Sequence, residues 1–294
     1  MTNQRSDDNN NPLLNSGIEY FSDEVKRSGI MNYRSTALPT WCPGCGYYGI
    51  THGLANALKN LHVNNNNLVI VSGIGCAGRY PFFVKGYGLH GIHGRALPIA
   101  SGIKMVRPEF TVLAIGGDGD GLGIGGGHLP HAIRRNIDIT YILFDNAIYG
   151  LTKGQASPTT PFGQYTKTTP YGNPEKPLNP ILIGLAYGAS FVAQGFAGFP
   201  QDLTIVFQEA IQHKGFSFVV VTTPCVTFDH ANITYQRFRN IWKKIPEDHD
   251  KQNLANAMAL AQDGNYYNGI LFQDHRNAWH DVQQSIRKNT SITK

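Results

Sequence analysis

The chain has 294 residues, of which 41% are hydrophobic and 33 are glycines, so it is long enough to bury a full core as one α/β domain. Its net charge of +5 is modest, and it has no Lys/Arg cluster of the kind that binds nucleic acid. Only 15% of the residues are charged, below the roughly 25% of an average soluble protein, which suggests that part of the surface is covered by a partner protein.

Residues 1–30 are polar and predict an arm outside the folded domain. They lack the basic-then-apolar order of a signal peptide. The sequence also has no run of about 18 apolar residues, the length that a membrane-spanning helix needs. We therefore expect a cytoplasmic protein with no membrane association.

Apolar runs alternate with helical patterns through residues 31–233, which we expect to form one domain. Strands are predicted over residues 68–71, 111–115, 139–144, 190–194 and 218–222. Helices are predicted over residues 50–61, 96–106, 125–135 and 181–187, and between Pro200 and Gly215. This alternation is typical of an α/β protein with a mostly parallel sheet and helices on both faces. Residues 234–294 are polar and aromatic and predict an extension that packs on a partner subunit.

An acidic, glycine-rich turn follows the predicted strand 111–115. Asp118 and Asp120 stand among glycines, which allow a tight turn and a close approach to a ligand. The next strand delivers Asp145 and Asn146 to the same edge of a parallel sheet, where ligands bind in open α/β folds. A carboxylate and an amide oxygen at that edge suit Mg²⁺ together with phosphate oxygens. The alternatives are an ordinary βα turn and, for Asp120, a cap on the helix that follows.

The chain has four cysteines, which a reducing cytosol makes more suitable as metal ligands than as disulfides. Cys42 and Cys45 flank a Pro-Gly turn that can direct both sulfurs toward one centre. Cys76 and Cys225 stand singly, each just beyond the end of a predicted strand. Four thiolates suit a zinc site or a [4Fe–4S] cluster, and the spacing alone leaves both open. The paired cysteines could also form a redox dithiol.

Several motifs, taken in order, resemble one family. The GDG string around Asp118, followed by Asn146 and then Ile148, resembles the motif that binds thiamine diphosphate and Mg²⁺. The string DNAIYGLTKGQASPTT, at Asp145–Thr160, is similar to the β subunit of 2-oxoacid:ferredoxin oxidoreductases. The cysteines lie in similar strings, WCPGCG, GIGC and TTPC. The resemblance extends over about residues 39–229 and implies a thiamine diphosphate-binding fold.

The resemblance implies ligands for two metal centres. It assigns Mg²⁺ to Asp118, Asn146 and the backbone carbonyl of Ile148. It assigns a [4Fe–4S] cluster to the four cysteines, which are Cys42, Cys45, Cys76 and Cys225.

The resemblance also implies a cofactor pocket with two ends. Gly119 and Asp120 would lie along the diphosphate, with Gly150 and Leu151 on its far side. The thiazolium end would be bordered by Ile74, Gly75, Cys76, Ala77 and His93.

Two residues of this region are candidate catalytic groups, His93 and Arg79. For His93 the alternative is a structural histidine in a tight turn. A guanidinium at Arg79 could bind a substrate carboxylate through two hydrogen bonds, although relatives often carry Lys there.

The function that the resemblance implies is oxidative decarboxylation of a 2-oxoacid with coenzyme A, with electrons passing from thiamine diphosphate through the cluster to ferredoxin. The string YGLHGIHGRALPIASG favours 2-oxoglutarate, with pyruvate next. The carboxylate that acts on the aminopyrimidine ring generally comes from a second domain, so we expect activity only with an α subunit. The alternatives are a non-oxidative thiamine diphosphate-dependent decarboxylase or synthase, and a zinc-stabilised scaffold that binds a partner.

Overall fold

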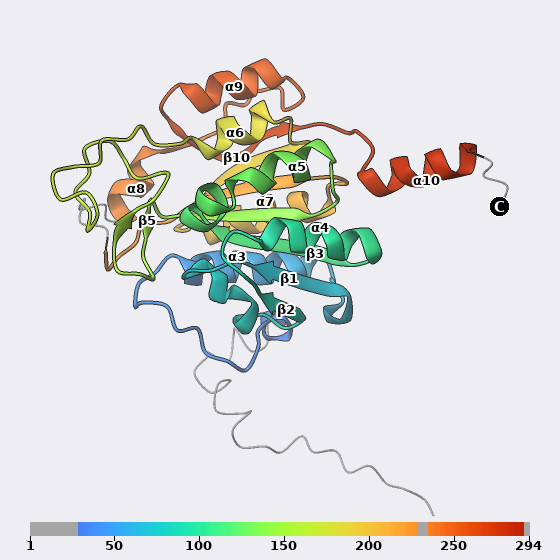
Figure 1. Ribbon diagram of the computed structural model, residues 1–294, viewed down its shortest axis with the longest axis horizontal. Helices are drawn as coiled ribbons and strands as arrows, with labels where there is room; N and C mark the ends of the chain where they lie inside the picture. Colours follow the sequence, from blue (N-terminus) through green and yellow to red (C-terminus); the bar gives the residue numbers. More distant parts are fainter. Residues whose placement is uncertain (1–28, 229–234, 291–294) are drawn as a thin grey trace, which may run out of the picture.

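One eight-stranded sheet organises the chain, and the computed structural model describes residues 29–228 and 235–290. The strands are β1 (Leu68–Ser72), β2 (Tyr87–His90), β3 (Thr111–Gly117), β4 (Thr140–Asp145), β7 (Phe191–Phe196), β8 (Ser217–Thr222), β9 (Trp242–Lys244) and β10 (Tyr266–Gln273). Their order is β2-β1-β3-β4-β8-β7-β10-β9 (Figure 1). Neighbours from β2 to β7 run parallel, whereas β10 runs antiparallel to β7. The predicted mostly parallel α/β sheet is therefore confirmed.

Helices cover both faces of the sheet. The helices are α3 (Tyr47–Asn60), α4 (Ala96–Val106), α5 (Leu129–Arg134), α6 (Pro180–Ala186), α7 (Pro200–Gln212), α8 (Tyr235–Ile241), α9 (Leu254–Gln262) and α10 (Trp279–Asn289). Helices α3 and α7 pack on each other and share one hydrophobic core. A second core contains side chains of α4, α5, α6 and α9, and a small third cluster joins Phe196, Phe238 and Trp242.

The central strands contribute to both cores because their side chains alternate between the faces. In β1, Leu68 and Ile70 belong to the core under α3, whereas Val69 and Val71 belong to the opposite one. All five residues of this strand are buried. Burial on both faces explains why the strand has a continuous apolar run rather than an alternating pattern.

The predicted helix over residues 125–135 is wrong in its extent. A short π-helical segment, η4 (Gly119–Ile124), is broken at Gly123 and is followed by the 3₁₀ turn η5 (Gly126–His128). Only α5 is a regular helix in this region. The physical reason is the glycine content, because glycine loses the most conformational freedom when it becomes helical and permits the sharp changes of backbone direction seen here.

The C-terminal residues take part in the same sheet as the rest of the chain. Strands β9 and β10 extend it beyond β7. The predicted boundary between residues 233 and 234 lies outside the described residues, and strands of one sheet precede and follow it. By contrast, α10 projects away from the body of the molecule (Figure 1) and buries none of its residues. Packing of this extension on a partner stays a prediction.

The predicted polar arm, residues 1–30, lies almost wholly outside the described residues. Its last residue, Ile30, begins the 3₁₀ turn η1 (Ile30–Tyr33) and is buried in the core under α3. Among the described residues, no helix combines the length and the apolar character that crossing a membrane requires.

Candidate active site

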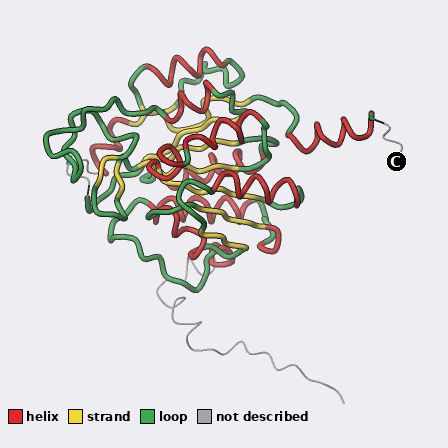
Figure 2. Tube along the Cα trace, in the orientation of Figure 1, coloured by secondary structure: helices red, strands yellow, loops and turns green. Residues whose placement is uncertain are grey.

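The site lies where parallel strands end. The chain leaves β1 toward Ile74, β3 toward Asp118, β4 toward Asn146 and β8 toward Cys225. Loops gather at this end of the molecule, opposite α10, and the two-stranded unit of β5 (Ile148–Tyr149) and β6 (Gln155–Ala156) lies among them (Figure 2).

A cavity of about 150 Å³ opens at this edge. Every residue that the sequence assigned to the diphosphate, the thiazolium end or Mg²⁺ lines it: Ile74, Gly75, Cys76, Ala77, His93, Asp118, Gly119, Asp120, Asn146, Ile148, Gly150 and Leu151. Sequence reasoning missed four further lining residues, Tyr47, Gly117, Tyr149 and Thr152. Two of them could have been predicted from neighbouring motifs, because Gly117 begins the GDG string and Tyr149 lies between Ile148 and Gly150.

Asp118 is held at the end of β3 by a buried polar network. Its Oδ1 accepts a hydrogen bond from the backbone N–H of Asn146 at 3.4 Å. The hydroxyl of Thr159 lies 2.9 Å from Asp118 Oδ2 and 2.8 Å from Asp145 Oδ1, so two carboxylates compete for one proton. Burial raises the pKa of Asp118, and burial together with the charge of Asp118 raises the pKa of Asp145. Burial therefore disfavours the charged form of both carboxyl groups.

The turn after β4 presents the amide group predicted to bind Mg²⁺. Ala147 adopts a left-handed conformation, with φ of 57°, that is uncommon for a residue other than glycine. The hydroxyl of Thr160 donates a hydrogen bond of 2.6 Å to its carbonyl. The N–H of Ile148 donates to Asn146 Oδ1 at 3.2 Å, and Asn146 Nδ2 lies 3.4 Å from the hydroxyl of Tyr47. These contacts fix the strained turn at the cavity wall.

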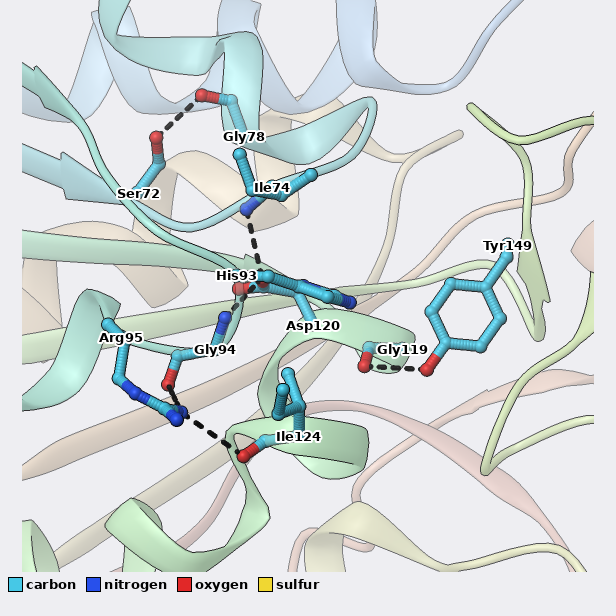
Figure 3. A network of polar contacts seen from close by, with 10 residues as sticks. All are labelled: Ser72, Ile74, Gly78, His93, Gly94, Arg95, Gly119, Asp120, Ile124 and Tyr149. Atoms are coloured by element: carbon cyan, nitrogen blue, oxygen red, sulfur yellow. Dashed lines mark hydrogen bonds and ion pairs between the residues drawn. The ribbon is translucent and has the colours of Figure 1, made fainter.

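Asp120 contacts two loops rather than capping the segment that follows it (Figure 3). Its Oδ1 accepts hydrogen bonds from the N–H groups of Ile74, at 2.9 Å, and Gly94, at 2.7 Å. The same oxygen lies 2.6 Å from His93 Nδ1. Asp120 therefore ties the loop after β1 to the loop after β2.

The cysteines gather around a second cavity of about 140 Å³. All four line it, together with Arg79. The indole N–H of Trp41, next to Cys42, donates a hydrogen bond of 2.8 Å to the carbonyl of Cys76 and so joins the two cysteine loops. Burial, reinforced by the neighbouring cysteines, raises the pKa of Cys45 to about 12 and that of Cys76 to about 11.

The two cavities adjoin each other. Their shared wall consists of Tyr47, Cys76, Asn146, Gly150 and Leu151. Over residues 29–228 and 235–290, no three His, Cys, Asp or Glu side chains form a preassembled metal site. The ligand roles of the cysteines and of Asp118 remain predictions.

The two candidate catalytic residues line different cavities. His93 lines the first, whereas Arg79 lines the second. The guanidinium of Arg79 donates a hydrogen bond of 3.0 Å to the hydroxyl of Thr40. A substrate carboxylate at Arg79 would therefore lie on the side of the shared wall that the cysteines occupy.

Comparison with known proteins identifies the class of protein first. A family model described as "Thiamine pyrophosphate enzyme, C-terminal TPP binding domain" matches residues 73–221. A second model, for the C-terminal part of the pyruvate ferredoxin oxidoreductase beta subunit, matches residues 225–288. The first match covers every lining residue of the cavity around Asp118 except Tyr47. The fold and cavity are therefore those of a thiamine diphosphate-dependent enzyme.

Individual relatives identify the family. The chain is 44% identical over 270 residues to "2-oxoacid:ferredoxin oxidoreductase 2, subunit beta" of Aeropyrum pernix, covering 88% of this chain and 85% of that protein. It is 46% identical over 192 residues to "2-oxoglutarate oxidoreductase subunit KorB" of Mycobacterium tuberculosis, covering 65% of this chain and 52% of that protein. The chain belongs to the β subunits of 2-oxoacid:ferredoxin oxidoreductases, as the sequence motifs indicated.

A solved structure agrees with this assignment. The 2-oxoglutarate:ferredoxin oxidoreductase from Magnetococcus marinus, with 2-oxoglutarate, coenzyme A and succinyl-CoA bound, contains a chain that is 42% identical in sequence. The two chains superimpose with a TM-score of 0.87. The superposition covers 90% of this chain and 92% of that one.

Proposed function

We propose that this chain binds thiamine diphosphate and Mg²⁺ and, together with an α subunit, converts a 2-oxoacid and coenzyme A to acyl-CoA and CO₂ in the cytoplasm. 2-Oxoglutarate is the favoured substrate, with pyruvate next, and ferredoxin receives the electrons through a [4Fe–4S] cluster. The observation that carries the proposal is the shared wall of the two cavities, because it brings the predicted cofactor pocket next to the cysteines. When bound, thiamine diphosphate supplies the carbanion that attacks the keto carbon, and the cluster accepts the electrons.

The residues around Asp118 suit a hard divalent cation. Carboxylate and carbonyl oxygens, with diphosphate oxygens and water, are the ligands that Mg²⁺ prefers. Asp118 is only 2% exposed, and burial raises its pKa, so a bound cation would favour its charged form. Gly117 precedes it without a side chain, and a Cβ there would have its nearest atoms 3.9 Å away, which leaves room for a diphosphate beside the backbone.

The cysteines suit a cluster that needs thiolate ligands. Burial and mutual repulsion disfavour thiolates in Cys45 and Cys76, and iron bound to them would offset both effects. A Cβ on Gly150 would lie 3.5 Å from the sulfur of Cys225 and 3.8 Å from that of Cys76. A glycine therefore separates the predicted cluster from the predicted diphosphate site, which supports transfer of electrons across the shared wall.

Iron analysis of the anaerobically purified α/β complex tests the cluster. We expect iron and sulfide in the wild-type complex and absorption near 400 nm that is lost in Cys225→Ser. Zinc without iron in the wild type would support the scaffold alternative, and unchanged iron in Cys225→Ser would refute that ligand.

Steady-state kinetics of the same complex tests the substrate. We expect a higher kcat/KM for 2-oxoglutarate than for pyruvate with coenzyme A and ferredoxin present. A preference for pyruvate would reverse the substrate assignment, and CO₂ release that does not reduce ferredoxin would favour the non-oxidative alternative.

A further inference from the structure

The loop between β6 and α6, residues 157–179, has polar side chains inside and aromatic side chains outside. Every residue that it buries is polar: Ser157, Thr159, Thr160, Thr166 and Asn173. All of its aromatic side chains are exposed, Phe162 by 73%, Tyr165 by 67% and Tyr171 by 96%. This distribution is the reverse of the usual one, and it is typical of a surface that contacts a partner.

Hydrogen bonds between polar groups give the loop a fixed shape. The backbone N–H of Gly163 donates to the carbonyl of Asn173, and the N–H of Asn173 donates to the carbonyl of Gln164, both at 2.8 Å. These two bonds place residues 162–165 beside residues 171–173. Asn173 Nδ2 also donates to the carbonyl of Thr160 at 2.9 Å. The loop is therefore held together by its polar groups and brings its three aromatic residues close to one another.

The inner part of the same loop contacts the predicted cofactor pocket. The hydroxyl of Thr159 lies 2.9 Å from Asp118 Oδ2 and 2.8 Å from Asp145 Oδ1. The hydroxyl of Thr160 donates to the carbonyl of Ala147 at 2.6 Å. In Figure 1 the loop projects as the yellow-green segment at the left, next to β5 and at the end opposite α10. The expected carboxylate for the aminopyrimidine ring has to reach this edge of the sheet from a second subunit.

We propose that Phe162, Tyr165 and Tyr171, together called the aromatic surface, dock the α subunit by filling apolar pockets on its side of the active site. Aromatic side chains are enriched at the centres of protein interfaces, where a few of them contribute most of the binding energy. The fixed shape of the loop lowers the entropy cost of docking. The charged residues of the loop are also exposed and suit a polar rim: Lys167, Glu175 and Lys176. The inference rests on the proposed function, because it needs an α subunit as the partner.

Removing two rings of the aromatic surface tests the docking. Sedimentation velocity of the anaerobic α/β complex over a dilution series measures its dissociation constant. We expect Phe162→Ser combined with Tyr171→Ser to raise this constant by about 10-fold or more, as for other aromatic anchors of interfaces. The unfolding temperature of the chain alone should stay unchanged, because both side chains are exposed. An unchanged dissociation constant would overturn the proposal. If the double variant does not fold, Tyr171→Ser alone decides in the same way.

The matched control is Val106→Ser, which changes an apolar side chain that is 77% exposed. Val106 ends α4 just before β3 begins, so it lies at the edge of the sheet opposite the cavities. This variant should keep the wild-type dissociation constant. An equal increase in Val106→Ser would show that loss of any exposed apolar side chain weakens the complex, which would overturn a specific role of the aromatic surface.

Two other results would assign the aromatic surface to a different partner and overturn the proposal. One is a raised KM for ferredoxin in the double variant with unchanged α association. The other is self-association of the wild-type chain that the double variant loses, again with unchanged α association. The association measurement needs no turnover, so a wild-type complex that forms but converts no 2-oxoacid would overturn the proposed function alone. No association of the wild-type chain with the α subunit would overturn both.

Discussion

At the scale of single residues, Asp118 is the group whose loss should separate the two predicted centres. We expect Asp118→Ala to abolish thiamine diphosphate-dependent decarboxylation, because it removes the only predicted carboxylate ligand of Mg²⁺. Iron content should stay unchanged, since Asp118 lines the first cavity and not the second. Decarboxylation assays and iron analysis of the α/β complex check both parts. Equal loss of iron would contradict separate sites.

Individual site residues could be predicted from the sequence where they lie within a local motif. Asp118, Asn146 and Ile148 follow strand ends in recognisable strings, and all three line the cavity. Thr159, which bridges Asp118 and Asp145, lies within the string Asp145–Thr160, but the resemblance assigned it no role. Its role depends on a loop that returns to the sheet edge after β6, and no local pattern specifies such a return.

At the scale of elements, the segment η4 packs closely against Tyr149 because Gly119 has no side chain. A Cβ on Gly119 would lie 2.2 Å from the ring of Tyr149, whereas a Cβ on Gly126 would have no atom within 4 Å. We expect Gly119→Ala to lower the free energy of unfolding by about 1–3 kcal/mol, the usual cost of overpacking. Gly126→Ala, the matched control in the following turn, should leave it unchanged or slightly higher. Thermal unfolding measures both, and equal destabilisation would contradict this account.

Helix α10 is a long helix of which the rest of the described fold buries no residue. It contains Val282, 41% exposed, and Ile286, 60% exposed, four positions apart on one side of the helix. We expect Val282→Ser combined with Ile286→Ser to weaken association with the α subunit. The free energy of unfolding should change by no more than about 0.5 kcal/mol, as for other surface substitutions.

Calorimetry measures the association of α10 variants with the α subunit, and thermal unfolding measures their stability. Gln283→Ser, on the same helix, should associate like the wild type. Unchanged affinity in the double variant would show that this helix does not contribute to the interface with the α subunit.

At the scale of the whole molecule, the buried His213 should make stability depend on pH. His213 is 6% exposed, its Nε2 lies 2.8 Å from the hydroxyl of Ser190, and burial lowers its pKa from 6.5 to about 4. The unfolded chain therefore takes up a proton at a higher pH than the folded chain. The contribution of neutral His213 to the free energy of unfolding is complete above pH 6.5 and is lost as the pH falls toward 4.

Removing this titration should flatten the pH dependence. We expect the unfolding temperature of the wild type to fall between pH 7 and pH 5 by more than that of His213→Gln. His131→Gln, which removes an exposed histidine of α5, should behave like the wild type. Identical pH dependence in His213→Gln and the wild type would show that His213 does not contribute.

Five of the eight strands, the helices between them, the mostly parallel sheet and most residues at its carboxyl edge could be predicted from the amino-acid sequence, whereas β2, β9 and β10 could not. These features follow from local patterns, because continuous apolar runs predict buried strands and the motifs sit at the strand ends. Only the tertiary structure decided that Asp120 binds His93 and two loop N–H groups, and that one wall separates the cysteines from the predicted cofactor pocket. The physical reason is that side-chain partners from different loops meet through the packing of the whole sheet, and sequence spacing does not encode that meeting.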